Sequence, residues 1–288
     1  MSPVGRFAPS PTGPLHMGSL FTALGSYLSA KSRGGLWLLR FDDLDTPRNV
    51  AGATDAILDT LLAHGLQPDA PAYYQSRNLA AYQEALDVLR GAGALFSCTC
   101  SRKDLDGQRI YPGTCRDHST PRPNDTWRYR AGKIVITFDD AVQGRQRHDL
   151  AVTTGDFVVR RREGYFAYHL ACAVDDANGI TEVVRGVDLL DATPAQVALM
   201  LALGKPPPTY AHLPLMTNRD GQKLSKQSHA PAVASDRAAD NLRRCLPLLG
   251  IRLPPAAIGW PVSHLLAHAR ENFAIGQVPA YLPPASGD

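Results

Sequence analysis

Two short stretches, one near the start of the chain and one near its end, carry residues suited to binding a nucleotide. The early stretch runs through a Pro/Gly-rich turn, residues 9–14, to His16 and Gly18. The late one is a glycine-led loop, residues 221–227, that holds Lys223 and Lys226. Backbone N–H groups at a turn that opens a helix bind anions, and lysine side chains add positive charge. The spacing of a P-loop is absent, so both stretches would have to serve one nucleotide.

The elements that must position the early residues are a strand, a turn and a helix. Residues 5–8 can form a short buried strand, and the prolines of residues 9–14 exclude a helix or an inner strand. From residue 15 onward, apolar side chains recur at helical spacing over about four turns. This pattern places His16 and Gly18 in the first helical turn, where the glycine lets a ligand approach the backbone.

A second strand is predicted at residues 36–41, a continuous apolar run that follows Gly34 and Gly35. Strand, helix and strand in this order form a unit of a parallel sheet. Such sheets bind ligands beyond the carboxyl ends of their strands. The turn at residues 9–14 and the acidic cluster at residues 42–45 both fall at that edge. We therefore predict an α/β, Rossmann-like domain with its ligand site there.

The rest of the chain divides by pattern into more of this domain, an insertion and a C-terminal region. Helices are predicted at residues 55–64, 79–89, 193–203, 236–249 and 264–273, and strands at 134–138, 145–148, 157–160, 165–169 and 181–186. Thr193 before Pro194 predicts an N-cap. We predict a discontinuous catalytic domain (1–93 and 163–229), an inserted α+β subdomain that bears zinc and faces RNA (94–162) and a short helical region (230–288).

Three cysteines in the predicted insertion match a zinc site. Cys98 and Cys100 are two positions apart, so on a strand both side chains point to one face. Cys115 follows a Tyr-Pro-Gly turn that can fold its thiol back toward them. Three reduced thiols at this spacing predict one structural Zn²⁺ per chain, and the alternative is three buried free thiols. Cys172 and Cys245 are predicted to be isolated core residues.

The composition limits the class of protein. The chain has 288 residues, of which 44% are apolar, so it can bury a substantial core. A formal net charge of +3 neither demands nor excludes nucleic acid, so any RNA surface must be local. No apolar run reaches the length of a membrane span, and no signal peptide is seen. Five cysteines, an odd number, fit a reducing compartment. We expect a cytoplasmic protein.

The RNA surface is expected in the insertion, where arginines meet phosphates and Trp127 or Tyr129 stacks on a base; the alternative is a solvated basic face. The arginines in question are Arg116, Arg122, Arg128, Arg130, Arg145 and Arg147.

Taken together, these motifs resemble the class I aminoacyl-tRNA synthetases, which pair an HxG helix start with a lysine loop in this order. The sequences RFAPSPTG, LHMGS and KLSKQ are similar to the motifs of the glutamyl branch of this class. The resemblance extends to about residue 230, and the chain has no length for the helical anticodon-binding portion of full glutamyl-tRNA synthetases. With KLSKQ in place of KMSKS, and with its cysteine element, the chain resembles the glutamyl-Q tRNA(Asp) synthetase family.

The resemblance implies an enzyme that activates L-glutamate with ATP, without tRNA, to form glutamyl-adenylate. The glutamate is then transferred to the cyclopentenediol of queuosine in the anticodon of tRNA(Asp). The implied partners are L-glutamate, ATP with Mg²⁺ and the anticodon stem-loop of tRNA(Asp). We expect a monomer without a membrane partner.

The resemblance also assigns residues to sites. Glutamate binding is implied for Arg6, Phe7, Ala8, Pro9, Ser10, Asp42, Tyr168 and Arg185. ATP binding is implied for His16, Gly18, Lys223, Ser225 and Lys226, with His16 and Lys226 as the catalytic pair. Zinc binding is implied for Cys98, Cys100, Tyr111 and Cys115. A phenolate ligand is chemically unusual, and His118 is the physical alternative to Tyr111.

The chemistry of glutamate fits these assignments. Arg6 and Arg185 can each grip a carboxylate bidentately, Asp42 suits the ammonium group and Tyr168 offers a directional hydroxyl. Each residue also has a structural alternative: Arg185 an ion pair with Glu182, Asp42 a cap for the following turn and Tyr168 a place in the core. The family often has Glu at the position of Asp42. Ser19 replaces the second His of the signature, which is usual in this branch.

Two other functions are compatible with the motifs. The first is a minimal glutamyl-tRNA synthetase that charges tRNA(Glu), against which KLSKQ argues. The second is a catalytically silent, zinc-bearing RNA-binding paralogue, which would have no need of an intact His16, Gly18 and Lys226.

Overall fold

The computed structural model describes residues 2–101, 103–105, 107–117, 122, 124–217 and 231–282. Its first sheet is parallel and has the order β1-β2-β3, formed by β1 (Val4–Phe7), β2 (Leu36–Phe41) and β3 (Tyr73–Tyr74). The helix α1 (Met17–Lys31) connects the first two strands. The predicted strand–helix–strand unit is confirmed, because the apolar run of β2 fills the inner position of this sheet.

A second sheet has the order β7-β6-β10-β9 and lies beside the first. Its strands are β6 (Val135–Asp140), β7 (Gly144–Asp149), β9 (Glu182–Gly186) and β10 (Thr209–Leu213). The strand β10 pairs in parallel with both β9 and β6, whereas β6 and β7 form an antiparallel hairpin. Thr181 N donates to Val4 O at 3.0 Å, which fastens the start of β9 to the start of β1.

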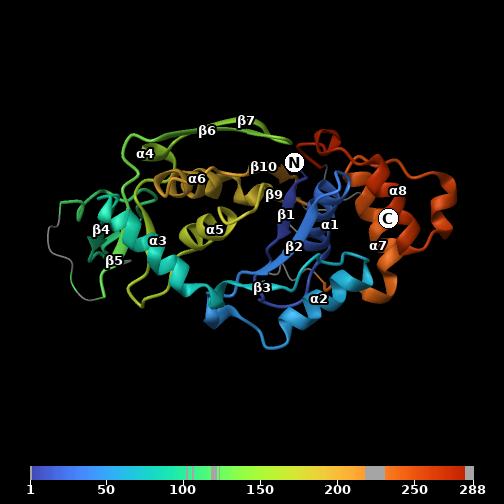
Figure 1. The fold of residues 1–288 in the computed structure, drawn as a ribbon, viewed down its shortest axis with the longest axis horizontal. Coiled ribbons are helices and arrows are strands. Elements are labelled where there is room, and N and C mark those ends of the chain that lie inside the picture. The colour runs from blue at the N-terminus through green and yellow to red at the C-terminus, as the bar shows by residue number, and fades with distance from the viewer. Residues whose placement is uncertain are drawn as a thin grey trace.

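Three helices share a core with this second sheet, namely α3 (Leu79–Gly91), α5 (Tyr168–Asp176) and α6 (Thr193–Ala202). The same core reaches a small antiparallel sheet of order β4-β5-β8, formed by β4 (Leu95–Cys98), β5 (Thr126–Tyr129) and β8 (Phe157–Arg160). The short helix α4 (Leu150–Thr153) follows β7. Figure 1 shows β4 and β5 at one end of an elongated molecule.

The opposite end carries the C-terminal helices α7 (Ala238–Leu248) and α8 (Val262–Asn272), with α2 (Ala53–Ala63) nearby (Figure 1). These helices belong to the same buried cluster as α1, β1 and β2. Gly25 of α1 permits the close approach: a Cβ atom there would lie 2.5 Å from Leu213 Cδ1 and 3.3 Å from Leu249 Cδ2. The C-terminal region therefore packs directly against the helix that opens with the HxG motif.

Several predicted elements differ from the structure. The predicted strand at residues 165–169 is wrong: Phe166 forms an isolated bridge with Arg160, and α5 begins at Tyr168. Thr193 is the first helical residue of α6 rather than its N-cap, which is Ala192. His16 precedes the first turn of α1 and occupies its N-cap position.

The predicted domain division stays a prediction, but part of the segment 94–162 joins the second sheet. Tyr210 of β10 pairs with Asp140 of β6, so the β6–β7 hairpin continues the sheet that contains β9. Within the described ranges, no helix is both long enough and apolar enough to cross a membrane.

Candidate active site

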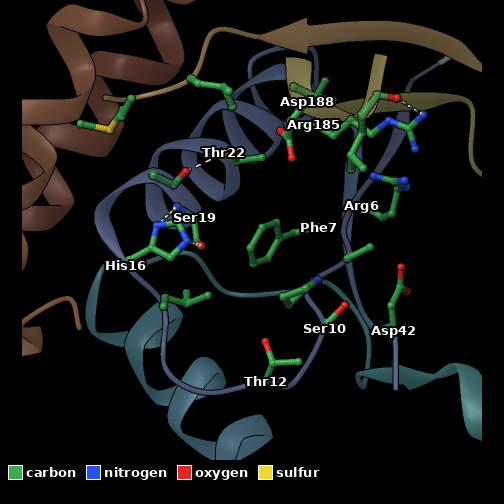
Figure 2. Close-up of a pocket in the computed structure, with 18 of the residues that line it drawn as sticks. Arg6, Phe7, Ser10, Thr12, His16, Ser19, Thr22, Asp42, Arg185 and Asp188 are labelled. Atoms are coloured by element: carbon green, nitrogen blue, oxygen red, sulfur yellow. Dashed lines mark hydrogen bonds between the residues drawn. The ribbon is translucent and has the colours of Figure 1, made fainter. Parts of the chain in front are cut away.

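A cavity of about 460 Å³ opens at the carboxyl ends of β1, β2, β9 and β10. Figure 2 shows His16 and Ser19 on one side of it, Arg6, Arg185 and Asp42 on the other, and Phe7 between them. The structure brings together ten of the residues assigned from the sequence, and their roles stay predictions. These residues are Arg6, Phe7, Ala8, Pro9, Ser10, His16, Gly18, Asp42, Tyr168 and Arg185.

The Pro/Gly-rich turn forms the floor of the cavity and is tied to the chain that follows β2. Asp42 N donates to Pro9 O at 3.1 Å, and Val50 N donates to Pro11 O at 2.9 Å. Gly13 has a φ of 129°, a conformation that side-chain-bearing residues rarely adopt. The turn therefore depends on glycine at this position and on two backbone hydrogen bonds.

His16 holds the start of α1 through Ser19. Its Nδ1 accepts a hydrogen bond from Ser19 N at 3.2 Å, and its Nε2 lies 2.9 Å from Ser19 Oγ. Because Nδ1 accepts, the neutral ring carries its proton on Nε2. The imidazole thus caps the helix and fixes the orientation of Ser19 at the edge of the cavity.

Arg185, at the carboxyl end of β9, is buried and is held by three neighbours. Its Nε donates to His212 Nε2 at 3.1 Å, and its Nη2 donates to Thr193 Oγ1 at 2.7 Å and to Leu189 O at 3.4 Å. Among the described residues, its Nη1 is buried and has no hydrogen-bond partner. A buried guanidinium nitrogen without a partner is costly, so a ligand oxygen is expected at Nη1. The alternative ion pair with Glu182 is absent among the described residues, because Glu182 pairs with Arg33.

Arg6 is also held along one edge. Its Nε and Nη2 donate to the two carboxylate oxygens of Asp176 at 2.9 and 3.1 Å. Arg40 donates to the same carboxylate at 2.6 Å. Burial alone would raise the pKa of Asp176, but the guanidinium groups of Arg40 and Arg6 hold it well below its usual range. Asp176 is therefore ionised, and it holds Nε and Nη2 of Arg6.

Asp42 contacts the protein as well as the cavity. Its carboxylate accepts from Arg40 Nε at 2.7 Å and lies 3.6 Å from Cys172 Sγ. Burial raises the pKa of Asp42, which the neighbouring Arg40 only partly offsets. The neighbouring acid Asp43 instead accepts from Ser76 N at 2.8 Å, and Asp45 pairs with Arg48. Of this acidic cluster, Asp42 is the member that lines the main cavity.

Tyr168 lies at the mouth of the site, since 39% of it is exposed; the alternative of a core tyrosine is wrong. A smaller cavity of about 120 Å³ adjoins the main one and shares Ser10, Asp42 and Tyr168 with it. The smaller cavity is also lined by Arg48 and Arg161 and by the aromatic rings of Tyr165 and Phe166.

The lysine loop lies outside the described residues, and so do Lys223, Ser225, Lys226 and the alternative zinc ligand His118. The described residues on both flanks of residues 218–230 lie at the main cavity or contact residues that line it. Met216 lines it, and Ala232 pairs with His16, while Val233 N donates to Leu15 O at 2.8 Å.

Three thiols and one phenol meet beside β4. The sulfur atoms of Cys98, Cys100 and Cys115 lie within 4.8 Å of one another. Tyr111 Oη lies 3.4 Å from Cys98 Sγ and 3.6 Å from Cys100 Sγ, and it accepts from Cys115 N at 2.8 Å. Three sulfurs at this spacing fit three of the four positions around a tetrahedral zinc ion, and the Tyr111 oxygen lies beside two of them. The cluster could therefore hold zinc, with the role of Tyr111 still a prediction.

Several arginines expected to face RNA instead support this cluster. Arg116 pairs with Asp156, Arg130 Nη2 donates to Arg116 O at 2.7 Å, and Arg128 lies over the Tyr111 ring at 4.1 Å. Tyr129 is buried in the core. Arg145 and Arg147 lie on β7, which belongs to a different sheet from β4, the strand that ends with Cys98.

Sequence reasoning missed Asp176 and His212, which contact the site arginines directly. It also missed Arg40 and Asp140, which in turn contact Asp176 and His212. Arg6 and Arg40 sit within apolar strands, and a buried guanidinium needs an acidic partner. The sequence therefore indicated that these arginines need acidic partners, but it did not indicate which carboxylates of the chain supply the negative charge.

Comparison with known proteins gives three consistent findings. A sequence model of the family described as "tRNA synthetases class I (E and Q), catalytic domain" matches residues 4–130 and 126–253. A Glutamyl-Q tRNA(Asp) synthetase from Dechloromonas aromatica is 50% identical over 286 residues, which cover 96% of this chain and 95% of that protein. A protein of the same name from Chromobacterium violaceum is 49% identical with the same coverage.

A solved structure is similar over nearly all of this chain. It is a glutamate tRNA ligase from Elizabethkingia meningosepticum in complex with its amino acid, with a TM-score of 0.80 and 26% sequence identity. The match covers 97% of this chain and 66% of the ligase, so this chain spans about two thirds of the ligase's length.

Proposed function

The chain belongs to the class I tRNA synthetase family for glutamate and glutamine, a family of ligases, and from this premise we propose a two-step reaction. The enzyme activates L-glutamate with ATP in the absence of tRNA, which yields glutamyl-adenylate and pyrophosphate. A hydroxyl of the cyclopentenediol of queuosine in the anticodon of tRNA(Asp) then attacks the glutamyl carbonyl, which forms an ester and releases AMP. The names of the two bacterial relatives support this choice of acceptor.

The observation that carries the proposal is the buried, unpaired Nη1 of Arg185 in the cavity that also contains His16. Arg6 lines the same cavity. We assign the side-chain carboxylate of glutamate to these two arginines, the ammonium group to Asp42 and a directional contact to Tyr168. Glutamine is disfavoured because an amide leaves a buried positive charge without a counter-charge.

The other half of the cavity suits the triphosphate. The turn before α1, with Gly13 and the N–H groups at the start of the helix, provides an anion site, and His16 stands at its edge. We assign Lys226 to the same phosphates. The described residues on either side of its loop support this assignment, because Met216 lines the cavity and Ala232 pairs with His16. Mg²⁺ would accompany the nucleotide and be held by the phosphates rather than by a protein cage.

The activation step requires positioning rather than acid–base chemistry. The α-carboxylate of glutamate is ionised at neutral pH, so it can attack the α-phosphorus of ATP without a general base. The oxygen–phosphorus bond to pyrophosphate breaks as the new bond forms. The charge that develops on the phosphates is stabilised by Lys226, His16 and the helix N-terminus.

We assign the acceptor nucleoside to the smaller cavity, because it shares Ser10, Asp42 and Tyr168 with the glutamate site. Its aromatic side chains can stack on a base, and Arg48 and Arg161 can meet phosphates. Zinc at the cysteine cluster would be structural: bound there by Cys98, Cys100, Cys115 and Tyr111, it would cross-link the end of β4 to the following loop.

The test is glutamate-dependent exchange of pyrophosphate into ATP without RNA, followed by transfer of labelled glutamate onto tRNA(Asp) with and without queuosine. We expect exchange without tRNA, and labelling only of the queuosine-containing tRNA(Asp). Exchange that strictly needs tRNA, with labelling of tRNA(Glu), would instead identify a minimal glutamyl-tRNA synthetase. RNA binding without any exchange would identify a silent paralogue.

A further inference from the structure

The residues behind Arg185 form a chain of hydrogen bonds that starts at Asp140 on β6. The Asp140 carboxylate accepts from Val142 N at 3.0 Å, from Gln143 N at 2.8 Å and from His212 N at 3.1 Å. It also accepts from His212 Nδ1 at 2.6 Å. Burial acts to raise the pKa of Asp140, but these hydrogen bonds outweigh it and lower the pKa to about 2. Asp140 is therefore a permanent buried negative charge.

The tautomer of His212 follows from its two neighbours. A carboxylate can only accept a hydrogen bond, so the Nδ1 that faces Asp140 carries the proton. A guanidinium can only donate, so the Nε2 that faces Arg185 Nε at 3.1 Å offers its lone pair. Burial lowers the pKa of His212 despite the nearby Asp140 charge, which keeps the ring neutral. If Nε2 of His212 carried the proton, it would face Arg185 Nε as a second donor and no hydrogen bond could form between them.

The chain of contacts leaves Arg185 with little freedom. Nε is fixed by His212, and Nη2 is fixed by Thr193 Oγ1 at 2.7 Å. Asp140, His212 and Thr193 are all buried, so water cannot replace these partners. Nη1 is the nitrogen that remains for a ligand.

We propose that Asp140, His212 and Thr193 form a positioning relay that sets the tautomer and the orientation needed for Arg185 to receive a carboxylate of glutamate. The relay does not touch the substrate and rests on the proposed function of the cavity. It links three strands, since Asp140 lies on β6, His212 on β10 and Arg185 on β9. The β6–β7 hairpin, which sequence patterns place in the insertion, thereby contributes to amino-acid selection.

Two substitutions of one residue separate the relay from general packing. In His212→Gln, the side-chain oxygen can take the place of Nε2 and accept from Arg185. In His212→Asn, the shorter amide can still donate to Asp140 but no longer reaches Arg185. Loss of a charge-assisted hydrogen bond predicts that the KM for glutamate rises about 10- to 100-fold in His212→Asn. We expect His212→Gln to stay within roughly threefold of the wild type.

The readout is pyrophosphate exchange, with glutamate varied at saturating ATP and then ATP varied at saturating glutamate. The relay predicts a change in the KM for glutamate while the KM for ATP stays constant. Thr193→Val, which keeps the side-chain volume but removes the second acceptor of Arg185, is expected to act like His212→Asn. His64→Gln, at a buried and hydrogen-bonded histidine outside the cavity, is the matched control and should leave both constants unchanged.

Equal effects of His212→Asn and His212→Gln, or no effect of His212→Asn and Thr193→Val, would overturn the relay. A rise in both KM values would do the same, since it would indicate general damage. If His212→Asn does not fold, the KM values of Thr193→Val alone test the relay. An ¹⁵N NMR spectrum of the histidine rings, assigned with His212→Gln, tests the tautomer without any substrate. A proton on Nε2 of His212 contradicts the relay, whereas wild-type protein without glutamate-dependent exchange contradicts the proposed function instead.

Discussion

Arg6 and Arg185 approach the cavity in the same manner, each fixed along one edge by buried partners. Asp176 holds Nε and Nη2 of Arg6, while His212 and Thr193 hold the same two atoms of Arg185. From the sequence, each of the two arginines was a candidate to grip a carboxylate bidentately. In the structure, protein groups already hold Nε and Nη2 of both arginines, so neither arginine can offer that edge to a ligand. Under the proposed function, selection of glutamate depends on the distance between two fixed groups rather than on a single flexible side chain.

Lys226 is the residue whose removal should separate chemistry from binding. Because the lysine is assigned to the charge that develops on the phosphates, Lys226→Ala should lower the exchange rate by roughly 100-fold or more. Binding of tRNA(Asp), measured by filter retention, should survive. Lys205→Ala, at an exposed lysine after α6, serves as the control. An unchanged exchange rate in Lys226→Ala would remove this lysine from the mechanism.

At the scale of elements, the cysteine cluster ties β4 to the loop that contains Tyr111 and Cys115. We expect about one zinc ion per chain by elemental analysis. Cys98→Ser should abolish it, because a hydroxyl is a poor zinc ligand and Cys98 is a central member of the cluster. Loss of the metal should lower thermal stability and transfer to tRNA more than amino-acid activation.

The matched control for this prediction is Cys245→Ser. Cys245 is equally buried, but it contacts Met17 at the other end of the molecule, so its loss should leave the zinc content unchanged. A well-folded wild-type protein that contains no zinc would contradict the prediction.

The elements that sequence patterns predicted well are those with strong local signals. The apolar run of β2 and the glycine after α2 define their elements without help from distant residues. The segment at residues 165–169 was misread because its aromatic residues favour a strand. In the structure, Tyr168 instead starts α5, whose buried face packs into the second core. Tertiary packing outweighed local preference there.

The residues of the candidate site likewise fall into those that a local motif marks and those that no local motif marks. The turn, His16 and the two arginines could be found because motifs mark them. Arg40, Asp140 and His212 could not, because their partners lie far away in the chain: Arg40 meets Asp176 across 136 positions, and His212 meets Asp140 across 72. A local pattern contains no information about such pairs.

For the molecule as a whole, the buried His64 and His212 and the half-buried His169 predict an acid-sensitive fold. Burial lowers the pKa of His64, His169 and His212 below the ordinary value of 6.5, and for His169 burial and then Arg185 bring it to about 4. The unfolded chain binds protons near pH 6.5 while the folded chain does not. Stability is therefore complete above that pH and declines as the pH falls toward the folded-state pKa values.

We expect the melting temperature, followed by circular dichroism, to fall by roughly several degrees between pH 7 and pH 5. His169→Gln should show a shallower decline, because one of the three rings no longer takes up a proton on unfolding. His264→Gln, at an exposed histidine of α8, should follow the wild type. Parallel curves for His169→Gln and the wild type would contradict this account.

The contact between Cys245 and Met17 has a consequence for how the protein can be divided. The sulfur atoms of the two residues lie 3.6 Å apart, and Met17 directly follows the histidine that faces the cavity. The last two helices thus support α1 behind the end of the cavity that we assign to the nucleotide. A version of the protein that ends at residue 230 would expose the leucines of α1 to water. His16 would then lose the helices that hold α1 in place.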